Sequence, residues 1–393
     1  MTQSYRNHDL KLKIALLSVC IVSASLNAIT ANIPEMAKTF SDVPLYKVEL
    51  LTTIPSLFQM IGVLGGRTIA KAAGYKKTMI MGLLFCGIGG ILPVFIPEFT
   101  LIMITRCLFG IGAGLIMSTI LTLILHFFDG KTRSTMIGLN GGISGLGSAV
   151  TTFAAGLLAV RGWNISFAVY FVAVPVILLF SWIVPDVRHS EHGSVTDRAE
   201  NKPAFIKLLG LGLLMFVSCL FATIYVIKAS TLITESGFGT AAGGSYAITC
   251  ISVGSIIAGL TYGRIRAMLD KKALPFYYLI CLLGFLAGGL AKGLVPVLIG
   301  AFLLGFGYLG FMPYIQEEAS RTFAAYGETA TNLILVFQSL GAFAAPYLGN
   351  VFSLVSTNLQ TQFFMTGGGY ALLAVLSILP LLGKRSVPAI SAM

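Results

Sequence analysis

Twelve stretches of this sequence, each about 20 residues long, are almost entirely apolar, and no other feature restricts the fold as strongly. A helix of about 20 apolar residues has the length needed to cross the hydrocarbon core of a bilayer. Only 10% of the 393 residues are charged, whereas soluble proteins carry about 25%. The sequence therefore predicts an all-α membrane protein with spans near 13–35, 49–70, 79–96, 99–125, 137–160, 164–184, 205–228, 241–263, 274–291, 294–315, 329–353 and 362–382.

The basic residues are distributed unequally between the two sides of such a chain. When the connections between spans are assigned alternately, 20 of the 26 Lys and Arg fall on the side that carries both termini. Loops rich in Lys and Arg stay in the cytoplasm, so we expect a multi-pass protein of the cytoplasmic membrane with both termini inside. This asymmetry accounts for most of the net charge of +11, and we expect no nucleic-acid partner.

The second half of the sequence repeats features of the first at an offset of close to half the chain. Gly62 to Lys77 begins with Gly-x-x-x-Gly-Arg and ends with Lys-Lys, as does Gly259 to Lys272. The glycines of "LFGIG" at Gly110 recur in "LLGFG" at Gly305. We therefore predict an N-terminal bundle of six helices over 1–185, a cytoplasmic linker over 186–203 and a C-terminal bundle of six helices over 204–393.

These halves, with a basic loop between the second and third spans, resemble the major facilitator superfamily along the whole chain. The resemblance implies two pseudo-symmetric bundles with both termini inside. The signature of the loop in that family ends on Gly and two basic residues, which match Gly74, Lys76 and Lys77, while Lys71 and Ala72 replace its Asp-Arg pair. Arg67 and Asp129 are candidates for a substitute charge pair that latches the loop; the alternative is that both are solvated.

The fourth span reads "RCLFGIG" and places Arg106 where the drug:proton antiporters of this superfamily carry an intramembrane Arg. A charge inside the bilayer is costly, so Arg106 is a candidate for binding substrate or for coupling, and bracing of helix packing is the alternative. The fifth span reads "TTFAAG" and keeps only Gly156 of the glycine-proline element of those antiporters. This departure leaves the direction of transport open.

The 15 acidic residues all fall in loops or at expected helix ends, Glu49 among them. Export of cations coupled to protons needs an intramembrane acid, so we expect neutral or anionic substrates. Glu35 is the acid expected nearest to Arg106, with an exposed helix end as the alternative. Lys228 closes its expected helix, and we expect it at the membrane interface.

Several polar residues inside the spans are candidates for substrate contact. Each lies on its expected helix where its side chain can line a path between the bundles or form a hydrogen bond to a neighbouring helix. They are Asn27, Thr30, Gln59, Tyr225, Tyr308 and Gln338.

We expect proton-coupled export of small amphipathic neutral or anionic compounds, by a monomer in the lipid bilayer. Uptake of a small organic anion and a ligand sensor that transports nothing are the alternatives. The chain has no nucleotide-binding glycine loop and no cluster of nucleophile, base and metal ligands, so we expect no enzyme, no catalytic residue and no cofactor or metal.

Overall fold

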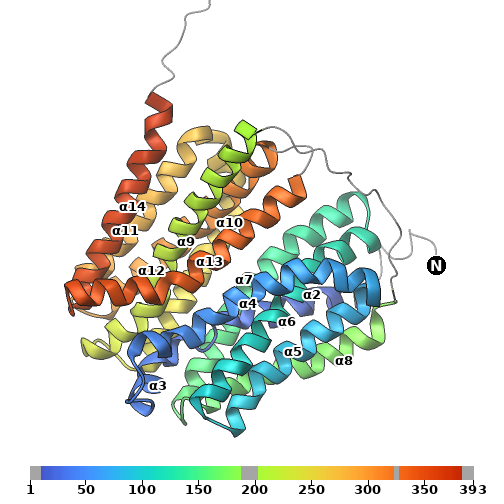
Figure 1. The fold of residues 1–393 in the computed structure, drawn as a ribbon, viewed down its shortest axis with the longest axis horizontal. Helices are drawn as coiled ribbons and strands as arrows, with labels where there is room; N and C mark the ends of the chain where they lie inside the picture. Colours follow the sequence, from blue (N-terminus) through green and yellow to red (C-terminus); the bar gives the residue numbers. More distant parts are fainter. Residues whose placement is uncertain (1–9, 187–201, 323–326, 383–393) are drawn as a thin grey trace, which may run out of the picture.

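A computed structural model describes residues 10–186, 202–322 and 327–382, and almost all of them are helical. Figure 1 shows the helices in two groups that follow the order of the sequence. The first group contains α2 (Leu10–Ala24), α3 (Ile33–Thr39), α4 (Leu45–Ala73), α5 (Tyr75–Phe95), α6 (Phe99–Phe127), α7 (Gly130–Ala159) and α8 (Ala173–Ile183). The second contains α9 (Lys202–Glu235), α10 (Ala241–Leu269), α11 (Ala273–Gly289), α12 (Leu294–Thr322), α13 (Gly327–Val355) and α14 (Leu359–Leu382).

Each group has its own hydrophobic core, and the predicted all-α fold of two six-helix bundles is confirmed. One core draws its buried residues from Leu12 to Val184 and the other from Leu208 to Ala374. The described residues contain 11 segments long and apolar enough to cross a membrane, and one of these, Gly243–Gly289, joins α10 and α11 through a single 3-10 turn. The twelve expected spans are therefore present as helices.

The outer surface of both bundles is apolar. Large side chains such as Leu64, Leu178 and Leu260 are more than half exposed. Soluble proteins rarely expose so many large apolar side chains over one surface, whereas a lipid bilayer solvates them.

The first span is not the continuous α-helix that the sequence predicted. The α-helix stops at Ala24, two 3-10 turns follow at Ser25–Asn27 and Thr30–Asn32, and α3 starts at Ile33. Pro34 favours the start of a new helix here, because it has no N–H to donate to the carbonyl of Thr30 and is well suited to the first turn of α3. Asn27 and Thr30, two of the expected candidates for substrate contact, therefore lie in 3-10 turns and not on one face of a continuous α-helix.

Glycines allow equivalent helix pairs of the two bundles to approach closely. A Cβ on Gly110 of α6 would overlap the carbonyl oxygen of Pro55 in α4. A Cβ on Gly305 of α12 would overlap the carbonyl oxygen of Ile251 in α10. Both pairs are thus held at a backbone separation that only glycine permits.

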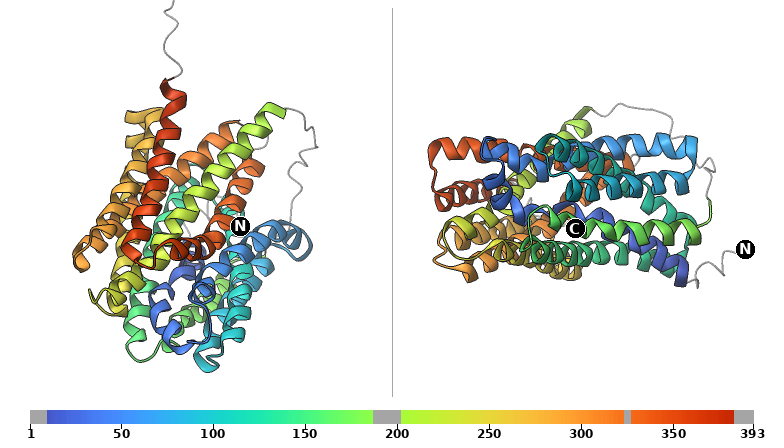
Figure 2. Two further views of the ribbon diagram at one scale, coloured as in Figure 1. Left: turned by 60° about the vertical axis from the view of Figure 1, so that its left-hand side comes forward. Right: turned by 90° about the horizontal axis from the view of Figure 1, so that it is seen from below.

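Side-chain contacts between the bundles gather at one end of the molecule. The ring of Tyr46 packs on Tyr347, Phe153 stacks on Tyr246, and Ser230 donates a hydrogen bond to the carbonyl of Ala31 at 2.6 Å. These residues lie near the start of α4 and α10 and the end of α7, α9 and α13. The two bundles meet at this end. Figure 2 shows the N-terminal bundle, at the blue end of the colour bar, and the C-terminal bundle, at the red end, from two other directions.

Most of the expected linker, 187–201, lies outside the described residues. The same is true of the side chain of Arg67, whose backbone belongs to α4.

Candidate functional site

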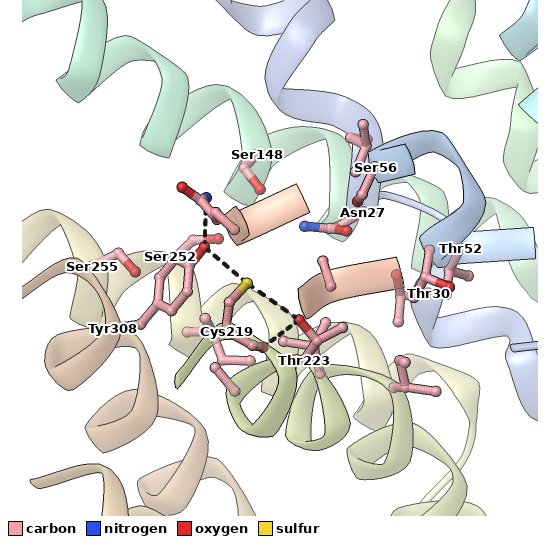
Figure 3. A pocket seen from close by; sticks show the side chains of 18 of the residues that line it. Asn27, Thr30, Thr52, Ser56, Ser148, Cys219, Thr223, Ser252, Ser255 and Tyr308 are labelled. Carbon is pink, nitrogen blue, oxygen red and sulfur yellow. Dashed lines mark hydrogen bonds between the residues drawn. The ribbon is translucent and has the colours of Figure 1, made fainter. Parts of the chain in front are cut away.

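A cavity of about 300 Å³ lies between the two bundles. Figure 3 shows side chains from both bundles around it, with Asn27 and Ser56 across from Cys219 and Thr223. A space enclosed by both halves changes shape when the halves move, which is the arrangement that alternating access requires.

The cavity lining mixes polar and apolar side chains and is uncharged. Its polar side chains carry hydroxyl, amide or thiol groups, and none of the described residues that line it is Asp, Glu, Lys, Arg or His. Apolar side chains such as Leu26, Val226 and Ile251 complete the wall. The site can therefore form many hydrogen bonds to an uncharged molecule with apolar parts, but it offers no opposite charge to an ion.

The N-terminal wall comes from the broken first span and from α4. The 3-10 turns bring Asn27 and Thr30 to the cavity. On α4 the polar residues Thr52, Ser56 and Gln59 occur at i, i+4 and i+7, share one face and all line the cavity. The expected candidates Asn27, Thr30 and Gln59 are thus brought together.

The C-terminal wall is organised around Tyr308 of α12. Gln338 of α13 donates a hydrogen bond from Nε2 to the Tyr308 hydroxyl at 3.0 Å, and the Cys219 sulfur lies 3.9 Å from that hydroxyl. The Oε1 of Gln338 is buried and accepts no hydrogen bond from the described residues. This buried acceptor is therefore unsatisfied in the state described.

Arg106 is not part of this cavity, contrary to a role in substrate contact in this state. It is fully buried within the N-terminal bundle, where its guanidinium donates hydrogen bonds to the carbonyl of Gly89 at 2.7 Å and to the hydroxyl of Tyr170 at 3.1 Å. The rings of Phe109, Phe167 and Tyr170 surround it at 4.9 to 5.1 Å. These contacts fit the alternative that Arg106 braces the packing of α5, α6 and the 3-10 segment Ile165–Val172.

Two further candidates also lie away from the cavity. Tyr225 is buried in the C-terminal core and donates a hydrogen bond to the carbonyl of Val297 at 2.8 Å. Glu35 is partly exposed on α3 and pairs with Lys38 at 2.8 Å, so it does not serve Arg106 in this state.

The latch candidates lie around the α4–α5 connection and at the start of α7. Gly74 joins α4 to α5 with φ of 90°, a conformation that favours glycine. Lys76 and Lys77 follow in the first turn of α5, and Asp129 precedes α7 at its N-cap. The side chain of Arg67 is not described, so the pairing of Arg67 with Asp129 stays a prediction.

The structure corrects the expectation for Glu49 and Lys228. Helix α4 begins at Leu45 and α9 continues to Glu235, so neither residue ends its helix. Both are buried, and the Nζ of Lys228 lies 2.7 Å from the Oε1 of Glu49. In the sequence, each of these two charges interrupts an apolar run near the same expected side of the membrane. This could have drawn attention to both residues.

Known proteins share this architecture. The sequence model described as Major Facilitator Superfamily matches residues 15–346. Among solved structures, the crystal structure of an auto-inhibited POT family peptide transporter superposes with a TM-score of 0.71 at 12% sequence identity, covering 98% of this chain and 99% of that one. At this identity the match shows a common fold.

Proposed function

Because this chain belongs to the Major Facilitator Superfamily, we propose that it is a secondary transporter that exports small amphipathic compounds by alternating access, coupled to protons. The single observation that carries the choice of substrate is the uncharged polar cavity between the bundles. The expectation of neutral or anionic substrates assumed that no acid lies inside the membrane, and the buried Glu49 contradicts that premise. The uncharged lining by itself favours neutral compounds over ions of either sign.

The physical reason is the cost of desolvating an ion. Moving a charged group from water into a protein interior costs several kcal/mol of hydration free energy, even after the protein relaxes around it. An opposite charge is needed to compensate this cost. The lining provides hydroxyls and amides instead, at Tyr308, Gln338 and Gln59 among others. Its apolar part, including Leu304 and Ile227, suits a compound with a hydrophobic surface.

The uptake of an organic anion anchored by Arg106 loses its main support, because Arg106 is bound to Gly89 and Tyr170 and does not line the cavity. The placement of Arg106 in the fourth span still favours the drug:proton antiporter branch of the family. The 1–185 and 204–393 bundles are the two bodies that rock about the cavity in this proposal.

The proposed orientation follows from the basic loops. With both termini in the cytoplasm, the end at which the bundles touch faces outward, and the cavity opens toward the cytoplasm. One chain supplies both walls, so a monomer in the cytoplasmic membrane suffices for transport.

The test compares cells that express the wild type with cells that express Gln338→Leu. A mixed panel of neutral, anionic and cationic amphipathic compounds is loaded, and the intracellular amounts are measured by mass spectrometry with and without a protonophore. Tyr347→Phe serves as the control, because it removes a hydroxyl outside the cavity.

We expect neutral compounds to be depleted by the wild type and by the control, and to be restored by the protonophore. Cells that express Gln338→Leu should retain more of the neutral compounds than cells that express the wild type. Selective depletion of ions would contradict the substrate class, and enrichment of compounds would contradict export.

A further inference from the structure

The two bundles are joined by a buried ion pair at the end where they touch. Glu49 belongs to α4 of the N-terminal bundle and Lys228 to α9 of the C-terminal bundle, and their side chains are 0% and 4% exposed. Gly349 of α13 lies against the Lys228 stem, where an added Cβ would sit 3.3 Å from its Cε. The pair thus fills the contact between the bundles rather than their surface.

The same pair borders the cavity. Thr52 and Thr53, within about one turn of Glu49, line the cavity, as does Ile227, the neighbour of Lys228. The pair therefore closes the cavity on the side where the bundles meet.

The charge of Glu49 depends almost entirely on Lys228. Its Oε2 accepts no hydrogen bond from the described residues, and Glu235 of α9 is the other ionisable group that acts on it. The remaining charged groups nearby on the packed elements have other partners: Glu35 and Lys38 of α3 pair with each other, and Arg106 of α6 bonds Gly89 and Tyr170. The described side chains of α13 carry no charge.

Glu49 is also the buried carboxylate that a proton-coupled cycle needs. The fully or nearly buried charged residues of the described chain are Glu49, Arg106 and Lys228. Arginine does not release its proton at any relevant pH, and the described lining of the cavity contains no acid. Of these groups, a carboxylate is the one that exchanges a proton most readily near neutral pH.

We propose that Glu49 is the proton-binding site of the transport cycle and that its ion pair with Lys228 clamps the bundles together when Glu49 is deprotonated. This inference rests on the proposed transport function for its purpose, but the clamp itself can be tested without a substrate.

The cycle follows from the chemistry of the pair. In the state described, the carboxylate and the ammonium compensate each other, and separating them without water would leave two uncompensated charges. When a proton adds to a carboxylate oxygen of Glu49, the neutral acid no longer attracts Lys228, which keeps its positive charge. The bundles can then part at this end, and water solvates the ammonium. Loss of the proton restores the carboxylate, and the pair forms again as the bundles close.

The sign of the pH dependence is set by this chemistry. The clamp is present at pH values above the pKa of Glu49 and is lost as the pH falls through it. Protonation therefore favours separation of the bundles at the end that now touches.

The first test measures the separation of the bundles in purified protein with spin labels at Val160→Cys and Thr240→Cys. These exposed positions lie at the end of α7 and at the start of α10, which pack together at the closed end. The six native cysteines are replaced by alanine, and distances are measured by electron double resonance at about pH 8 and about pH 5.

With Glu49 and Lys228 intact, we expect a short distance between the two labels at the higher pH and an additional population with a longer distance at the lower pH. Glu49→Gln should show the longer population at both, and the exchange of Glu49→Lys with Lys228→Glu should restore the short distance at high pH. Glu35→Gln, which breaks the exposed pair on α3, is the matched control and should behave as the wild type. The proposal is overturned if Glu49→Gln keeps the distances and pH response of the wild type.

The second test uses proteoliposomes and a compound identified in the panel experiment. Glu49→Gln should lose accumulation driven by a pH gradient, down to the level of protein-free liposomes, while exchange of labelled for unlabelled compound continues. If the single variant is unstable, the double variant Glu49→Gln with Lys228→Gln replaces it, because it leaves no buried charge unpaired. It should likewise lose gradient-driven accumulation and keep exchange.

Unchanged gradient-driven accumulation by both variants would overturn the assignment of Glu49. If the wild type itself moves no compound, the proposed function fails, and the distance measurement still decides the clamp.

Discussion

The guanidinium of Arg106 donates a hydrogen bond to the hydroxyl of Tyr170 at 3.1 Å, and both residues are buried inside one bundle, away from the cavity. Tyr170 in turn donates to the carbonyl of Ser25, at the point where the first span leaves the α-helix. Through Tyr170, Arg106 thus stabilises the segment at Ser25 that leads to Asn27 in the N-terminal wall of the cavity.

Replacement of Arg106 by Ala should therefore lower stability. The change leaves the Gly89 carbonyl without its donor and removes the cation from three aromatic rings, and we expect a loss of about 3 kcal/mol. Tyr170→Phe should cost about 1 kcal/mol, because the Ser25 carbonyl loses one hydrogen bond but keeps the one from the N–H of Ala28. Thermal unfolding in detergent measures both. A variant of Arg106 with normal stability that no longer binds substrate would contradict this assignment.

The close approach of α4 to α6 and of α10 to α12 makes a paired prediction. Gly110→Ala and Gly305→Ala would each place a methyl group against a backbone carbonyl, and we expect each to destabilise its bundle by about 1 to 3 kcal/mol. Gly263→Ala is the control, since a Cβ at this helical position meets no atom within 4 Å. The melting temperature should fall for the first two only; equal stability of all three would refute the packing argument.

The Tyr308 hydroxyl in the cavity wall predicts an effect on transport together with a small loss of stability, because Gln338 also donates a hydrogen bond to it. Tyr308→Phe removes the acceptor of the Gln338 amide and a hydroxyl from the cavity wall. If this hydroxyl bonds a neutral substrate, the loss of that bond, about 1 kcal/mol, should raise the KM about fivefold. Initial rates in proteoliposomes measure this change, and Tyr347→Phe should leave KM unaltered. A KM unchanged in Tyr308→Phe would place substrate elsewhere.

The proposed orientation can be checked by labelling. Ser41 lies between α3 and α4, and Lys77 lies in the first turn of α5; both are exposed. We expect a membrane-impermeant maleimide to react with Ser41→Cys in intact cells and with Lys77→Cys only after permeabilisation. The parent protein reports the background of the native cysteines. The reverse pattern would place both termini outside.

Local sequence features predicted the architecture well. Each helix hydrogen-bonds its own backbone in the bilayer, so its existence depends mainly on a sufficient apolar run, as α6 and α12 illustrate. The polar face of α4 was also readable, because Thr52, Ser56 and Gln59 recur with helical spacing. All three line the cavity.

Helix ends were less predictable, with a direct effect on the interpretation of charged residues. The apolar run after Phe205 weakens at Lys228, yet α9 continues for seven more residues to Glu235. The partner that makes this extension tolerable, Glu49, comes from the other bundle. Each charge is visible as an interruption of an apolar run, but the sequence gives no local sign that the two residues are partners and are therefore buried.

The sequence by itself determined that the chain forms apolar helices, how many there are, and that they fall into two similar halves, because hydropathy and repeats are local properties of the chain. Only the tertiary structure decided that Arg106 faces Tyr170, that Tyr225 faces its own core, and that Glu49 meets Lys228. In membrane helices the surfaces that face lipid and those that face protein are both apolar, so hydropathy does not reveal which faces meet. Close packing of the helices makes that choice, and with it selects the side chains that share a cavity.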